Sequence, residues 1–235
     1  MGLTADQARL LILVHKIRQK VPGFEVAFKD ESRSQRFLGK LLFFVAYMTD
    51  FITTFYPKVW WTTRKDYEDN PRGAFKTLAH EYIHLLDTKR SSMWFRLSYI
   101  MPLPCVVFSL VSLGAIWSSL WFLSSLAALV FLAPWPAYWR MRWEMRGYAM
   151  SMAVVAWESG SISDSTKESI AESFTGWSYY KMWPFKRAVR KLLDDLEKQI
   201  HTGDIMVQSP AFQEVKEICD ASDEQVIKAA EALAA

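Results

Sequence analysis

The chain has 235 residues, of which 51% are hydrophobic, and its formal net charge is +3. This small positive excess, spread along the chain, argues against a nucleic-acid-binding protein. Its two cysteines, Cys105 and Cys219, are too few for a disulfide framework, which favours a reducing compartment. The length allows one sizeable core, or one domain with a hydrophobic insertion.

The N-terminal residues predict two helices separated by a strand. Thr4-Ala5-Asp6-Gln7 fits a capping box, and an amphipathic helix follows until Pro22-Gly23 stops it. Apolar residues alternate from Phe24 to Phe28, which predicts a strand. A second helix is expected to begin after Ser32 or Ser34 and to run to about Val45.

A β-hairpin is predicted over residues 51–63. Both sides of Pro57-Lys58 are rich in β-branched and aromatic residues, and this dipeptide is a turn signal. The resulting small sheet matters for function, because an exposed edge strand can pair with an extended peptide substrate.

A long amphipathic helix is predicted from Pro71 to Lys89. Asn70 and Pro71 form a typical N-cap and first-turn pair. Apolar residues then recur with helical spacing, at Phe75, Leu78, Ala79, Tyr82, Ile83 and Leu86. The helix therefore presents one face to a core and carries the motif that begins at His80.

His80, Glu81 and His84 form the H-E-x-x-H pattern of zinc peptidases. Residues four apart lie on one helical face, so the two imidazoles can bind one Zn²⁺, while the glutamate acts as general base. Asp87 could orient a ligand imidazole by accepting its second N–H. The alternative is a chance spacing on a packing helix, but the helix cap and Asp87 favour a metal site.

No charged residue occurs from Leu97 to Trp139. One membrane crossing needs about 20 apolar residues, so this run suffices for two crossings joined by a tight turn. Prolines and aromatic residues mark both ends, as expected at a membrane surface. The alternative is a hydrophobic helical hairpin that is buried in an oligomer or lies in one leaflet. The length of the run favours membrane insertion.

Glu144 follows this run on another predicted helix. It shares a face with Gly147, Tyr148 and Ser151, and the small residues among them would let that face approach a second helix closely. Glu144 is therefore a candidate third zinc ligand. The alternative is a surface glutamate paired with Arg140, and spacing alone does not decide between the two.

The topology of the uncharged run favours the ligand role. Glu144 and the two histidines can share an ion only if they lie on the same side of a membrane, so the run must leave on the side where it enters. Basic residues flank both of its ends: Lys89, Arg90, Arg96, Arg140, Arg142 and Arg146. The positive-inside rule then predicts a membrane-associated protein with its catalytic domain on the cytoplasmic side.

The order of H-E-x-x-H, hydrophobic hairpin and Arg-x-Glu helix resembles the membrane-integrated gluzincins, which include the CAAX prenyl protease and the bacterial heat-shock membrane protease. The resemblance covers residues 59–157. It implies a zincin-like fold, zinc as cofactor, Glu144 as the third ligand and a peptide or protein substrate. The family usually has an aspartate four residues after this glutamate, where the present chain has Tyr148.

The remaining tyrosines and histidines give weaker signals. Tyr179 or Tyr180 could donate a hydrogen bond to an oxyanion, although packing is the favoured role, so the oxyanion donor stays unidentified. His15 and His201 have no neighbours with ligand spacing, which favours roles on helix surfaces.

Together these patterns predict a mainly α-helical protein with a small β-sheet (α+β). The expected parts are the N-terminal half of a zincin-like domain (1–96), the inserted hydrophobic hairpin (97–139), and the third-ligand helix with a C-terminal helical region (140–235). The expected function is zinc-dependent peptide hydrolysis, with a lipid bilayer or hydrophobic partner at 97–139. The alternatives are a non-catalytic structural or assembly protein with a zincin-like fold, and a zinc ion that only stabilises the fold.

Overall fold

The computed structural model describes residues 2–41, 48, 49, 52–101, 110–112, 123, 125–127, 129, 136–177 and 181–234. The chain forms two compact units. Unit 1 contains Met1–Arg90, Arg146–Ser163 and Asp194–Ala235, and unit 2 contains Ser91–Met145 and Asp164–Leu193. Two helices, α6 (Tyr138–Ser159) and α8 (Lys186–Thr202), continue without a break from residues of one unit into residues of the other.

Unit 1 contains a three-stranded mixed sheet of β1 (Glu25–Phe28), β2 (Thr53–Phe55) and β3 (Lys58–Trp61). The strand order is β1-β3-β2, with β1 parallel and β2 antiparallel to β3. β2 and β3 are joined at Tyr56-Pro57 and form the predicted hairpin, and β1 lies where alternation predicted a strand. Because β3 is central, β2 forms one edge of the sheet.

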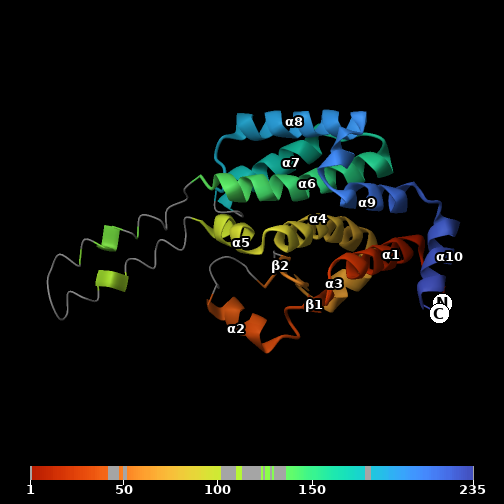
Figure 1. Ribbon diagram of the computed structural model, residues 1–235, viewed down its shortest axis with the longest axis horizontal. Helices are drawn as coiled ribbons and strands as arrows, with labels where there is room; N and C mark the ends of the chain where they lie inside the picture. The colour runs from red at the N-terminus through yellow and green to blue at the C-terminus, as the bar shows by residue number, and fades with distance from the viewer. Residues whose placement is uncertain are drawn as a thin grey trace. The chain divides into compact units, whose positions relative to one another are not determined.

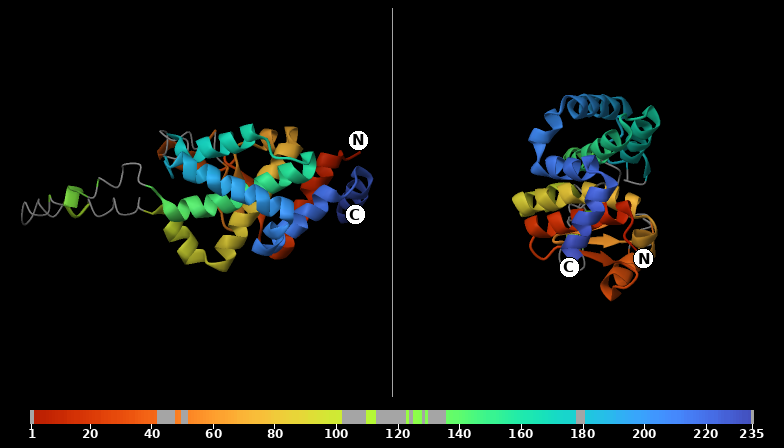
Figure 2. Two further views of the ribbon diagram at one scale, coloured as in Figure 1. Left: turned by 90° about the horizontal axis from the view of Figure 1, so that it is seen from above. Right: turned by 90° about the vertical axis from the view of Figure 1, so that its right-hand side faces the viewer.

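The described residues of unit 1 also form several helices. They are α1 (Ala5–Lys20), α2 (Arg33–Leu41), α3 (Arg64–Asp69), α4 (Pro71–Arg90), the second part of α6, the end of α8, the 3₁₀ helix η5 (Asp204–Gln208), α9 (Pro210–Asp220) and α10 (Asp223–Ala234). Figures 1 and 2 show α1 beside α4 and α10. The last residues of the predicted second helix, beyond Leu41, lie outside the described residues.

The caps predicted for two of these helices are confirmed. Thr4 and Gln7 form the reciprocal capping box of α1, with each side chain bonded to the backbone of the other. At the start of α4, the Gly73 amide donates to Asn70 Oδ1 over 3.0 Å. Each cap satisfies backbone groups that have no partner inside the helix, so the sequence fixes where both helices begin.

α4 is buried over much of its length, including the residues of the H-E-x-x-H motif. Phe75, Leu78, Ile83 and Leu85 are no more than 1% exposed, so apolar residues cover more of the helix surface than one narrow stripe. Replacing such a buried leucine with alanine typically costs about 2–5 kcal/mol of stability. This packing holds the helix, and therefore the motif, in a fixed position within unit 1.

The helices described for unit 2 include α5 (Ser92–Ile100), the first part of α6, α7 (Asp164–Thr175) and the first part of α8. α5 packs on α6 through Phe95 and Trp143, whose ring centroids lie 5.2 Å apart. Between α7 and α8, Glu168 pairs with Lys186 and with Arg190.

The predicted fold class is confirmed at the level of a mainly helical protein with a small mixed sheet. The expected hydrophobic hairpin, residues 97–139, lies mostly outside the described residues.

The predicted membrane association, with a catalytic domain on the cytoplasmic side, is wrong. Within the described part of the chain, no helix has the length and apolar character needed to cross a membrane. α5 enters the uncharged run but ends at Ile100 after 9 residues, whereas a crossing helix needs about 20.

Candidate metal centre

The two histidines of the motif lie on the buried side of α4. His80 is 9% and His84 5% exposed. Their Nε2 atoms are 3.2 Å apart, and the ring centroids are separated by 5.0 Å. The sequence predicts this pairing, since four residues make slightly more than one helical turn.

The separation of the two Nε2 atoms fits a shared metal ion. A tetrahedral zinc ion with Zn–N distances of about 2.0–2.1 Å holds two ligand nitrogens about 3.3 Å apart. The His80 and His84 nitrogens, 3.2 Å apart, therefore already have the required spacing. In a hydrogen bond between these two nitrogens, one ring donates and the other accepts, according to their tautomers.

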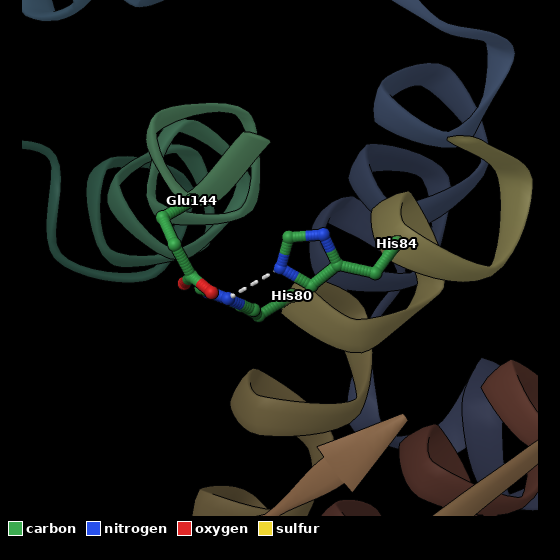
Figure 3. Close-up of side chains that lie close together, drawn as sticks. All are labelled: His80, His84 and Glu144. Atoms are coloured by element: carbon green, nitrogen blue, oxygen red, sulfur yellow. Dashed lines mark hydrogen bonds between the residues drawn. The ribbon is translucent and has the colours of Figure 1, made fainter. Parts of the chain in front are cut away.

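Glu144 completes the group from α6. Its side chain is buried, and a carboxylate oxygen lies with the two histidine nitrogens in a set whose atoms are all within 4.8 Å of one another. Figure 3 shows Glu144 reaching from α6 toward the histidines of α4. The structure thus brings together the three predicted ligands in a group that could hold a metal ion.

A glycine allows α6 to come this close to His80. A Cβ atom built on Gly147 would lie 2.4 Å from His80 Nε2, a distance that side chains essentially never adopt. One helical turn later, Ser151 Oγ lies 3.1 Å from His80 Nδ1, which leaves Nε2 facing His84. The Tyr148 ring meets the His80 ring edge to face at 5.0 Å. The close approach predicted for the Gly147 and Ser151 face is confirmed.

Asp87 and Arg146 join the two helices beside the ligands. Arg146 donates to both carboxylate oxygens of Asp87, over 2.9 and 3.0 Å. Burial is the larger influence and raises the pKa of Asp87 above its usual value, while Arg146 acts in the opposite direction. The orienting role predicted for Asp87 toward a histidine stays a prediction. Its observed partner lies two residues after Glu144, so the pair ties α4 to the third-ligand segment.

Glu144 has a further partner on α5. The Tyr99 hydroxyl donates a hydrogen bond to Glu144 Oε1. Tyr99 and Glu144 both belong to unit 2.

Glu81, the predicted general base, is surrounded by polar groups from the sheet. Thr54 on β2 donates its hydroxyl hydrogen to Glu81 Oε2 over 2.5 Å. Lys29, immediately after β1, is fully buried, and burial lowers its pKa to about 8, against the opposing attraction of the Glu81 carboxylate. The Glu81 side chain is only 8% exposed, and Thr54 and Lys29 are two of the polar groups that act on it.

Sequence reasoning missed Lys29, Thr54 and Tyr99 as parts of this site. Thr54 lies within the predicted hairpin over residues 51–63, and Tyr99 is one of the aromatic residues at the start of the uncharged run. A lysine at the end of a predicted strand was the one signal available for Lys29, because lysine is seldom fully buried without a partner. Tyr179 and Tyr180 lie outside the described residues.

The two other histidines lie away from this group. His15 Nε2 is 2.8 Å from the Gln19 amide, and His201 is an exposed residue 3.9 Å from Glu197. Both partners lie on the same helix as the histidine that they contact.

Comparison with known proteins found no match: no family model, no curated protein and no solved structure is similar to this chain.

Proposed function

We propose that this chain is a zinc-dependent metallopeptidase in which His80, His84 and Glu144 hold the ion and Glu81 is the general base. The observation that supports this most is the buried group of two histidines and one glutamate. Two histidines and a glutamate are the ligand set of several catalytic zinc sites, which keep a fourth position open. Glu81 follows the first ligand on the same helix, as the peptidase motif requires.

A zinc ion held by these ligands would supply a Lewis acid and lower the pKa of a water at the open position to about 7. Glu81 accepts the proton of the attacking water and passes it to the leaving amine. Thr54 holds Glu81 Oε2, so the direction in which the second carboxylate oxygen points is set as well. Ser151 fixes the His80 ring through Nδ1.

The edge strand β2 is the proposed binding element for the substrate. β2 is the terminal strand in the order β1-β3-β2, and Thr54 connects it directly to Glu81. An extended peptide that adds to this edge by backbone hydrogen bonds would run beside the general base. The substrate class is therefore a peptide or protein segment in extended conformation.

More specifically, we propose that the site is of the gluzincin type. Its support is the order of the ligands: two histidines four residues apart, then a glutamate on a later helix that carries Arg-x-Glu. Tyr148 stands where that family usually has an aspartate, and it packs on the His80 ring.

Glu81→Gln tests the proposal. The full chain is loaded with Zn²⁺, its metal content is measured, and hydrolysis of an unfolded protein substrate is followed. A general base typically contributes about 10²–10⁴-fold, so Glu81→Gln should lose hydrolysis by that factor while keeping its zinc. Glu25→Gln, on the exposed side chain of β1 that pairs with Lys58, is the matched control and should hydrolyse normally.

A wild-type chain that binds zinc but hydrolyses no peptide would contradict the peptidase and favour the second candidate, a structural metal site in a scaffold or assembly protein. One observation favours that candidate: all three ligands and Glu81 are at most 9% exposed. A structural site would show the same zinc content in wild type and Glu81→Gln, and no hydrolysis in either.

A further inference from the structure

The hydrogen bond between Tyr99 and Glu144 lies at the third proposed ligand. The Tyr99 hydroxyl donates to Oε1 of a carboxylate that is only 3% exposed. A carboxylate has two oxygens and can turn about its last bond, so a donor on one oxygen decides which oxygen faces a metal ion. Such partners of a ligand orient it and tune its strength.

We propose that Tyr99 is a positioning residue of the metal centre, holding one oxygen of Glu144 so that the carboxylate faces His80 and His84 in a single orientation. This inference rests on the proposed metal role of Glu144. It makes α5 a functional part of the centre, a role that the motif and its spacing do not assign to it.

The surroundings of Tyr99 hold its ring in place. The ring packs against Phe95 on the same helix, with centroids 5.6 Å apart, and the Arg140 guanidinium lies 5.2 Å from its centroid. Side chains locked by packing on regular helices give more precise sites than side chains on loops. The hydroxyl is therefore directed toward Glu144 by contacts that involve no metal.

The adjacent residues on the same two helices provide a structural comparison. Trp143 Nε1 donates to Ser98 Oγ over 3.0 Å, so residues 98 and 143 form a bond next to the one between residues 99 and 144. Ser98 also donates to the Phe95 carbonyl, and neither Ser98 nor Trp143 is among the proposed ligands. If the hydrogen bonds between α5 and α6 matter only for packing, removing the Ser98 hydroxyl or the Tyr99 hydroxyl should change stability and Zn²⁺ affinity in the same way.

The test measures Zn²⁺ affinity of the full chain by competition with a fluorescent chelator, alongside thermal unfolding of the metal-free protein. Tyr99→Phe keeps the ring and removes only the hydroxyl. It should lower Zn²⁺ affinity by about 10–100-fold, the usual loss when a partner of a ligand is removed. Ser98→Ala should leave Zn²⁺ affinity unchanged and lower only the melting temperature. The readout needs no hydrolysis, so a chain that binds zinc without cleaving peptides refutes the proposed peptidase and still tests Tyr99.

A double-mutant cycle supplies the second measurement. In a Glu144→Ala background, Tyr99→Phe should cause no further loss of Zn²⁺ affinity, because its effect passes through the carboxylate. Equal Zn²⁺ affinities of wild type and Tyr99→Phe would overturn the proposal. So would the same loss in both backgrounds, a matching loss in Ser98→Ala, or a Tyr99→Phe chain that does not fold, since each makes the hydroxyl a general structural group.

Discussion

The α4 and α6 sides of the candidate metal centre are built in different ways. On α4, both histidines come from one helix, and their Nε2 atoms lie 3.2 Å apart because of helical spacing alone. On α6, Glu144 is sixty residues away in the chain from His84 and is placed by contacts with other elements. These contacts are the close packing of Gly147, the Asp87 ion pair with Arg146, and the hydrogen bond from Tyr99.

The difference shows how a ligand set divides into a local and a long-range part. The local part forms wherever the helix forms, so changes elsewhere should leave the histidine pair intact. The long-range part depends on each contact that holds α6, so changes far from the ion should weaken binding through Glu144. The predictions below test this division, from the largest expected effect to the smallest.

Removing Arg146 should have the largest effect on stability. Arg146→Gln leaves the Asp87 carboxylate, 6% exposed, without its bidentate partner. Breaking a buried ion pair typically costs about 3–5 kcal/mol, and because the Arg146 side chain is 33% exposed, the lower end of that range is expected. Urea unfolding measures this loss, and Zn²⁺ affinity should fall as well.

Arg142→Gln is the control, because Arg142 is an exposed residue one helical turn earlier on α6. The double variant Asp87→Asn/Arg146→Gln should recover part of the lost stability, since it leaves no buried unpaired charge. Equal stability of wild type and Arg146→Gln would show that the pair does not hold α6.

Lys29→Met tests the surroundings of Glu81, on the α4 side, through the pH dependence of stability. In the folded protein the pKa of Lys29 is lowered to about 8 because the ammonium is buried. In an unfolded chain the pKa of a lysine is about 10.4. Between these values the unfolded chain binds more protons, so the contribution of Lys29 to the free energy of unfolding rises with pH. Below about pH 8 Lys29 is protonated in both the folded and the unfolded state. The folded state is then destabilised by the full cost of burying the ammonium, about 3 kcal/mol.

Lys29→Met should therefore be more stable than wild type at pH 7 by up to about 3 kcal/mol, and the difference should shrink toward zero near pH 10. Chemical unfolding at several pH values measures it, with Lys58→Met on the exposed side of the sheet as control. A difference that stays constant from pH 7 to pH 10 would rule out a lowered pKa at Lys29.

Gly147→Ala tests the close approach of α6. The added Cβ would lie 2.4 Å from His80 Nε2, so the helix or the ring must move. Overpacking of this kind costs about 1–3 kcal/mol, and Zn²⁺ affinity should fall because Glu144 moves with the helix. Thermal unfolding and zinc competition measure the two effects.

The sign of this effect should reverse when the ring is absent. In a His80→Ala background, Gly147→Ala should stabilise the chain by up to about 1 kcal/mol, because alanine is the better helix former. Destabilisation of equal size in both backgrounds would show that the glycine matters for a reason other than its contact with His80.

Local sequence patterns predicted most elements and the α4 side of the centre. Helix caps, strand alternation and a turn dipeptide each act over a few residues, so the caps at Thr4 and Asn70 and a turn at Pro57 could be assigned without knowledge of the fold. The predicted membrane association was wrong because it used the length of an uncharged segment in place of the length of a helix, and no helix in the described part of the chain is long and apolar enough to cross a membrane. α5 ends at Ile100, and a run of apolar residues does not by itself determine where a helix stops.

By itself, the sequence determined that His80, Glu81 and His84 share one helix, because helical periodicity and capping are local. Only the tertiary structure decided that Glu144 meets those histidines, that Tyr99 and Arg146 hold its segment, and that Lys29 and Thr54 surround Glu81. These contacts join residues 27 to 59 or more positions apart, or depend on a glycine where a Cβ would collide with His80. The physical reason is that periodicity acts within one helix, whereas such contacts depend on how separate helices and strands pack against each other.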